Sequence, residues 1–220
     1  AYTGPKPPYQ YLDVDKSYSW IKSPRWKGKP MEVGPLARLA VLYASGHAPT
    51  RETVDRTLKQ LDLPMTALYS TMGRTAARAL ESRLMVDQMQ GWFDQLMANI
   101  RAGDVKTHNQ SKWDPSTWPR EAKGAGFMEA PRGGLCHFVV IRDGKIANYQ
   151  AVVPTTWNAG PRDAQGNEGP YEASLRGTPL ADPAKPLEIL RTVHSFDPCL
   201  ACAVHVAGPR GEGSVLMQVR

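Results

Sequence analysis

Residues 65–101, MTALYSTMGRTAARALESRLMVDQMQGWFDQLMANIR, decide the fold of this 220-residue chain. Apolar side chains recur every four residues along the first half, and a slightly rotated stripe continues along the second. The two stripes are Leu68, Met72, Ala76, Leu80 and Leu84, followed by Met85, Met89, Trp92, Leu96 and Ile100. This spacing predicts a long helix that ends near Gly103, with its methionine-rich stripe in the core of a helix bundle.

Two shorter helices are expected before the long one. Pro35 stands at a first helical position and Gly46 at a stop, so residues 35–46 predict one helix. Residues 49–64 predict another, which ends at Pro64 and whose apolar face consists of Val54, Leu58 and Leu61. Prolines prevent a long helix in residues 1–33, for which we expect an extended, irregular segment laid over the core.

The pattern changes after a polar connection at residues 104–126. Residues 135–154, LCHFVVIRDGKIANYQAVVP, contain two β-type runs joined by Asp143-Gly144, a pair that suits a type I′ hairpin. Residues 157–185 have loop composition, and residues 186–196 predict a short helix. The expected fold is therefore α+β and mostly helical, with long bundle helices, a small antiparallel sheet and irregular loops around a cysteine motif.

Composition excludes several classes of protein. The formal charge is +6, but lysines and arginines are spread along the chain without a basic block, which favours a mildly basic surface and no nucleic-acid partner. No stretch approaches eighteen apolar residues, the length that a transmembrane helix needs.

Three cysteines are an odd number, which argues against a disulfide framework and for metal or redox chemistry. The start lacks both a methionine and a signal pattern, so we expect a part of something longer.

The motif DPCLACAVH, residues 197–205, places Cys199, Cys202 and His205 in C-x-x-C-x-x-H spacing. A structural zinc site needs four ligands, and the motif supplies three. Cys136 and His137 could supply the remainder, but adjacent strand residues point to opposite faces of a sheet, which weakens the zinc interpretation. A thioredoxin-like pair would begin a helix, whereas here a helix precedes the motif, and haem attachment would need histidine directly after the second cysteine. Half of a thiolate-rich transition-metal site is the remaining interpretation. The spacing alone leaves the choice open.

Further stretches occur in a characteristic order along the chain. They are SWIKSPRWKGKPMEVGPLAR at residues 19–38, GAGFMEAPRG at 124–133, YQAVVPTTWNAGPRD at 149–163 and PLEILRTVHSFDPC at 186–199. Together with DPCLACAVH, these stretches resemble the large subunit of nickel–iron hydrogenases, from about Tyr18 to the end of the chain. Several independent motifs in one order make a chance match very improbable.

The resemblance implies a set of metal ligands. Cys199 matches a terminal nickel ligand, and Cys202 matches a cysteine that bridges nickel to an iron carrying CO and CN ligands. Soft, anionic thiolates favour both metals. His205 matches a histidine that binds a nearby magnesium, or sometimes iron, ion. The backbone carbonyl of Ala151 matches another ligand of that ion.

The resemblance also implies residues around the metals. Arg132 matches an arginine held above the metals, which is thought to hydrogen-bond a cyanide and to act as, or orient, a base. Asp197 fits a partner for Arg132, because a carboxylate fixes a guanidinium. Pro154 and Thr155 match residues that surround the second cyanide. Without the resemblance, the sequence around these residues is typical of ordinary loops. Cys136 matches no metal ligand of the family, and we expect it to be packed within a strand.

Two departures from the family pattern bear on activity. The family's other two thiolates lie in an R-x-C-x-x-C motif near its N-terminus, with a glutamate of the magnesium site, and this sequence has no such motif. We therefore expect residues 1–205 to be the C-terminal part of a large subunit that is inactive alone. In the family an endopeptidase cuts directly after the histidine that His205 matches. Residues 206–220 are thus expected to be an extension that keeps the site open for metal delivery until maturation.

The function that the resemblance implies is H2 ⇌ 2H+ + 2e−, as in membrane-bound uptake hydrogenases. Electrons would pass to an iron–sulfur small subunit, since three cysteines cannot hold such clusters here as well. The mature enzyme is expected at the membrane on the periplasmic side through the small subunit, and its precursor in the cytoplasm. The alternatives are a small zinc-binding protein and an inactive truncated fragment.

Overall fold

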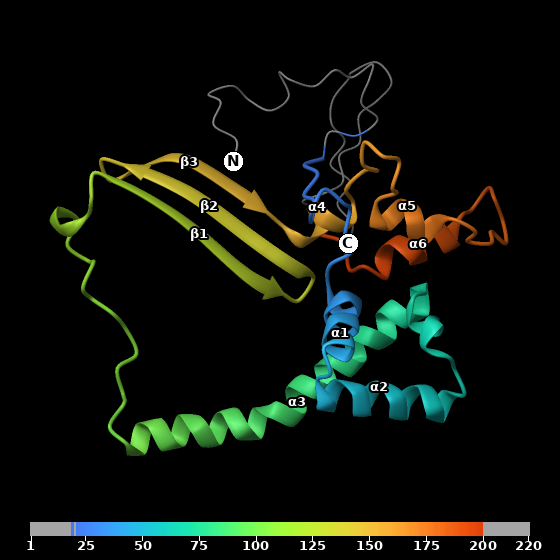
Figure 1. Cartoon of the computed structure of the whole chain (residues 1–220), viewed down its shortest axis with the longest axis horizontal. Helices are drawn as coiled ribbons and strands as arrows, with labels where there is room; N and C mark the ends of the chain where they lie inside the picture. Colours follow the sequence, from blue (N-terminus) through green and yellow to red (C-terminus); the bar gives the residue numbers. More distant parts are fainter. Residues whose placement is uncertain (1–18, 20, 200–220) are drawn as a thin grey trace.

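The computed structural model describes residue 19 and residues 21–199, where six α-helices, short 3-10 helices and one three-stranded antiparallel sheet form an α+β fold (Figure 1). The helices and the small sheet confirm the predicted fold class. No helix in this described part of the chain is long and apolar enough to cross a membrane. The extended conformation expected for residues 1–33 is found at residues 21–34, and the rest of that segment lies outside the described residues.

The hydrophobic core lies between α1 (Pro35–Ala44), α2 (Ala48–Leu61) and the first half of α3 (Thr71–Arg101). Its most deeply buried members are Leu39, Val54 and Ala77, each at most 1% exposed. Both short helices therefore form where proline and glycine predicted them. Leu61 of the predicted apolar face is 59% exposed, because α2 ends there and Asp62 turns the chain through the left-handed region.

The long helix α3 begins later than predicted. Residues Met65–Leu68 form a separate 3-10 turn, η2, and the Ser70 hydroxyl then caps α3 by accepting a 3.0 Å hydrogen bond from the Gly73 N–H. The residues of α3 that are buried are Gly73, Ala77 and Leu84. The methionine-rich stripe is not in a core formed by the described residues: Met85, Met89, Trp92, Leu96 and Ile100 are all at least 44% exposed. The second half of α3 extends away from the other helices (Figure 1).

The sheet has the order β1-β2-β3, with β1 at Glu121–Ala130, β2 at Gly133–Arg142 and β3 at Lys145–Val152. Asp143 and Gly144 both have positive φ, 48° and 72°, as the predicted type I′ turn requires. Residues 121–126 were expected in a connection, yet they form the first six of the ten residues of β1. The reason is that β1 pairs along its whole length with β2, and this pairing outweighs its glycine-rich composition.

Three short helices follow the sheet: α4 (Pro154–Asn158), α5 (Pro170–Leu175) and α6 (Leu187–His194). They lie together at the end of β3, with α5 packed on both α4 and α6 (Figure 1). α6 is the predicted short helix. α5 falls inside the segment expected to be loop, and Pro170 at its first position starts it. This arrangement brings the end of α6 close to the turn between β1 and β2.

Candidate metal centre

Cys199 is the last described residue, and the end of α6 positions it. The Asp197 N–H donates to the His194 carbonyl at 2.9 Å, and Asp197 then adopts φ 55°, which turns the chain out of the helix before Pro198. The backbone N–H of Cys199 donates to the Thr155 hydroxyl at 3.1 Å. The cysteine is therefore held against the first turn of α4.

Arg132 lies in the two-residue turn between β1 and β2 and reaches the same segment. Its Nε donates to the Asp197 carbonyl at 2.8 Å and lies 3.2 Å from the Asp197 carboxylate. Both side chains are roughly half exposed. Among the described residues, neither Nη group of Arg132 has a hydrogen-bond partner. The guanidinium is thus held by Asp197 through its Nε, and its two Nη groups can donate to a group that is not among the described residues.

Pro154 and Thr155 form the first turn of α4 and are both buried, Thr155 at 3% exposure. Proline is favoured there because its missing N–H is not needed in the first turn. The structure therefore brings together Arg132, Thr155, Asp197 and Cys199, which come from three separate stretches of sequence. Ala151 lies near the end of β3, paired in register with His137. Cys202 and His205 lie outside the described residues.

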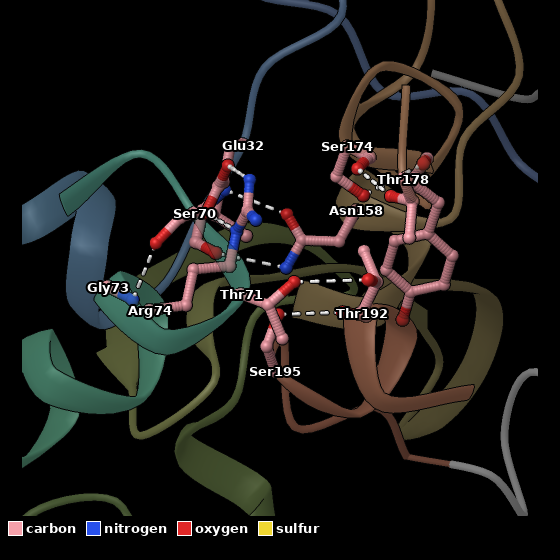
Figure 2. A network of polar contacts seen from close by, with 12 residues as sticks. Glu32, Ser70, Thr71, Gly73, Arg74, Asn158, Ser174, Thr178, Thr192 and Ser195 are labelled. Carbon is pink, nitrogen blue, oxygen red and sulfur yellow. Dashed lines mark hydrogen bonds and ion pairs between the residues drawn. The ribbon is translucent and has the colours of Figure 1, made fainter. Parts of the chain in front are cut away.

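A largely buried set of polar contacts connects these pieces, and no sequence pattern predicted it. Asn158 of α4, 2% exposed, accepts from the Val33 N–H at 2.9 Å and donates to the Val33 carbonyl at 3.0 Å. The neighbouring Glu32 carboxylate accepts two 2.8 Å bonds from Arg74 of α3 (Figure 2). The segment before α1 therefore joins α3 to α4. Both contacts span more than 40 residues of sequence, so local patterns could not reveal them.

The turn after α6 rests on α3 as well. The Arg74 guanidinium stacks over the Phe196 ring, 4.0 Å from its centroid, and Arg78 donates to the Ser195 carbonyl at 3.2 Å. Phe196 is only 4% exposed. Thr71 and Thr192 share a 3.0 Å hydrogen bond between α3 and α6 (Figure 2). These contacts fix the backbone that leads into Asp197 and Cys199.

Cys136 lies elsewhere, on β2, beside an apolar cavity of about 490 Å³. Its walls include Trp26, Val33, Phe127, Leu135 and Trp157. Burial, and to a smaller extent the charge of Glu129, raises the pKa of the Cys136 thiol. A thiol that resists ionisation is a poor metal ligand. Within residues 19 and 21–199, no cluster of three or more histidine, cysteine or acidic side chains is placed to hold a metal.

The described residues fit one edge of a thiolate-bound metal centre. Cys199 provides a soft donor, and the Arg132 guanidinium provides a fixed positive charge beside the same segment. The Thr155 hydroxyl accepts from Cys199 and still has its own proton to donate. A positive charge and a free donor suit an anionic group between them. One described thiol is not a complete ligand set, so a metal bound here would need further donors from outside the described residues.

Comparison with known proteins agrees with this geometry. The family described as nickel-dependent hydrogenase matches residues 1–205. The chain is 58% identical over 217 residues to the uptake hydrogenase large subunit of Rhizobium leguminosarum bv. viciae, covering 99% of this chain and 36% of that protein. It is 54% identical to the hydrogenase-1 large chain of Escherichia coli K12, covering 96% and 35%. The chain thus spans about 36% of the length of the curated relatives it matches.

Solved structures show the same fold. The Ni-Fe-Se hydrogenase from D. vulgaris Hildenborough in its reduced state gives a TM-score of 0.67 at 37% identity, covering 88% of this chain and 39% of that one. The reduced, active Ni-Fe-Se hydrogenase from Desulfomicrobium baculatum also gives 0.67, at 39% identity, covering 87% and 38%. The resemblance inferred from sequence motifs therefore extends to the three-dimensional structure.

Proposed function

The chain belongs to the nickel-dependent hydrogenase family, and from this premise we propose that it is the C-terminal part of the large subunit of a membrane-bound uptake hydrogenase. The reaction of the complete protein is H2 ⇌ 2H+ + 2e−. The observation that carries the proposal is the meeting of Arg132, Thr155 and Asp197 around Cys199. These residues lie up to 67 positions apart, and a generic metal-binding loop would not need them together.

We assign the ligands by the match to the family. Cys199 would bind nickel as a terminal ligand, and Cys202 would bind both nickel and an iron that carries CO and CN ligands. When bound, the nickel–iron centre would supply the redox chemistry of dihydrogen cleavage. His205 and the Ala151 carbonyl would hold a magnesium, or iron, ion nearby. Two further thiolates belong to the N-terminal part of the large subunit, so this chain alone is inactive.

The chain's own residues prepare the electrostatics of the site. Arg132 would present a fixed positive charge to an anionic cluster and would donate a hydrogen bond to one cyanide. Its contact with Asp197 orients the guanidinium and leaves the Nη groups to act. Because arginine deprotonates only at very high pH, orientation of a proton acceptor is a better role for it than that of the base itself. Thr155, beside Pro154, would donate a hydrogen bond from its hydroxyl to the second cyanide.

The partners follow from the same assignment. An iron–sulfur small subunit receives the electrons and brings the enzyme to the membrane on the periplasmic side. Residues 206–220 are an extension that a maturation endopeptidase removes in the cytoplasm. Two findings support this division: the family match ends at residue 205, while the match to the Rhizobium relative covers 99% of the chain and so continues beyond it.

The test is a chimera of this chain with the N-terminal portion of the Rhizobium relative, produced with that relative's small subunit and maturation system. We expect nickel and iron in the purified complex, a mass that ends at His205, and H2-dependent reduction of an artificial electron acceptor. Cys202→Ser should abolish metal incorporation. Arg132→Lys should retain the metals and lower kcat about 10²–10³-fold.

The control for the chimera is Arg83→Ala, which removes an exposed ion pair with Asp87 on α3 and should leave activity unchanged. Stoichiometric zinc without nickel or iron would instead support the small zinc-protein alternative. Full activity of the Cys202→Ser variant would refute the ligand assignment.

A further inference from the structure

Arg38 of α1 joins three parts of the molecule beneath the turn that carries Arg132. Its Nε and Nη2 donate to the two carboxylate oxygens of Glu81 on α3, at 2.5 and 2.7 Å. Its Nη1 donates to the Glu129 carboxylate at 2.9 Å. The Arg38 and Glu81 side chains are 18% and 19% exposed, so this ion pair is largely shielded from water. The hydrogen bonds that Arg38 donates to the Glu81 carboxylate raise the pKa of the Arg38 guanidinium, and burial opposes this effect.

The same guanidinium also holds the backbone of the turn. Nη1 donates to the Ala130 carbonyl at 2.9 Å, and Nη2 donates to the Pro131 carbonyl at 3.0 Å. These are the two carbonyls immediately before Arg132. Arginine suits the position because its planar fork directs several N–H groups at once, whereas a lysine has one point charge.

The opposite side of the turn is closed by backbone. A Cβ on Gly34 would lie 2.9 Å from the Arg132 carbonyl oxygen. Gly133 has φ 130°, and a Cβ there would lie 2.7 Å from the Gly34 nitrogen. The chain at residues 33–34 therefore packs closely against the turn that the Arg38 side chain holds, and neither glycine leaves room for a Cβ.

We propose that Arg38 is a positioning residue for Arg132. It fixes the turn to α1 and, through Glu81, to α3, while α3 also holds Ser195 and Phe196, which lead into Asp197. The guanidinium of Arg132 and the backbone of Cys199 thus share one rigid support. The catalytic part of this inference rests on the proposed function, since Arg132 matters only if it acts at the metals.

The structural part can be measured on the 220-residue chain without metal or activity. In Arg38→Ala we expect amide hydrogen exchange at residues 128–135 to accelerate at least tenfold, with exchange in the core of α1 and α2 unchanged. Arg38→Lys should give an intermediate rate, because it keeps a charge opposite Glu81 and loses the carbonyl bonds. Arg83→Ala is the matched control on an exposed ion pair. Equal exchange at 128–135 in all variants, or a uniform acceleration over the whole chain, would overturn the proposal.

The catalytic part uses the chimeric complex and a double-mutant cycle. We expect Arg38→Ala to lower kcat about 10–100-fold when Arg132 is present. In an Arg132→Lys background the same change should cost less than twofold, because a residue that acts through Arg132 has nothing left to position. The infrared bands of the cyanides should shift alike in Arg38→Ala and Arg132→Lys.

The two hypotheses fail in different ways. Equal losses of kcat in both backgrounds would show that Arg38 does not act through Arg132. Where Arg38→Ala does not assemble, Arg38→Lys replaces it in the cycle. An inactive, metal-free chimera with the parental Arg38 would refute the proposed function, and the exchange experiment would still decide whether Arg38 holds the turn.

Discussion

Tyr171 carries a buried hydroxyl that has no hydrogen-bond partner among the described residues. Burial, together with the nearby charge of Asp197, raises the pKa of Tyr171 to about 12. In the unfolded chain the phenol has its ordinary pKa of about 10 and releases its proton above that pH. In the folded chain its pKa is higher, so between these two pH values the folded state still holds the proton. The free energy of unfolding therefore falls as the pH rises from about 10 to about 12.

Tyr171→Phe should remove this part of the pH dependence. At pH 7 we expect the free energy of unfolding to stay the same or rise by about 1 kcal/mol, because an unpaired buried hydroxyl is lost while the ring contact with Phe196 remains. Urea unfolding of the chain between pH 8 and 12 measures both effects. Tyr69→Phe, at a tyrosine that is 62% exposed, controls for titration of other groups. An identical pH dependence in the Tyr171 and Tyr69 variants would contradict the expectation.

The candidate site residues could be predicted from the sequence, whereas the residues that hold them in place could not. Arg132, Thr155, Asp197 and Cys199 were singled out through a family resemblance, and the structure places them together. Their roles remain predictions. Arg38, Glu81 and Asn158 were missed because their partners lie 43 to 125 positions away, and a charged or amide side chain on a helix is ordinarily solvated.

Among the elements, α4 depends on a contact with the segment before α1. Asn158→Ala would leave both the N–H and the carbonyl of Val33 without their partner in a buried place. We expect the free energy of unfolding to fall by about 2–4 kcal/mol. Chemical denaturation checks this, with Asn99→Ala, at an exposed asparagine of α3, as the matched control. A loss below about 0.5 kcal/mol would show that the segment and α4 are not coupled.

The apolar spacing predicted that α3 forms a long helix, but it did not predict correctly which side of the helix is buried. A four-residue recurrence advances about 40° per step at 100° per residue, so Met72 drifts off the buried face and is 75% exposed. At the same 100° per residue, the buried residues Gly73, Ala77 and Leu84 lie about 110° around the helix axis from Met85, Met89, Trp92 and Leu96. The rotation between stripes is therefore large, and the two halves of α3 face different neighbours.

The hairpin is a contrasting element, because its signal is local. Asp143-Gly144 between two apolar runs was sufficient to predict β2, β3 and the turn between them. β1 was not predicted as a strand, since Gly124 and Gly126 lower its strand propensity. Pairing with β2 is a tertiary contact, and composition carries no information about it.

For the whole molecule, the apolar face on the second half of α3 has no cover within the described residues. Met85, Met89, Trp92, Phe93 and Leu96 are 47% to 59% exposed and recur at helical spacing on one side. A monomeric soluble protein rarely exposes a continuous patch of this kind. The chain spans about 36% of its curated relatives, so we expect the remaining part of the large subunit to bury this face.

Replacing Trp92, Phe93 and Leu96 together with glutamine should therefore have opposite effects on the chain and on the complex. In the isolated chain, solubility should rise while the free energy of unfolding changes little, because these side chains are outside the core. Association with the separately produced N-terminal portion of the Rhizobium relative should weaken at least 100-fold, since each large apolar side chain contributes about 1.5–3 kcal/mol when buried. Met72→Gln, on an exposed methionine of the first half of α3, is the control and should not affect association. Unchanged association of the triple variant, measured by titration of one labelled part with the other, would show that this face belongs to a different partner.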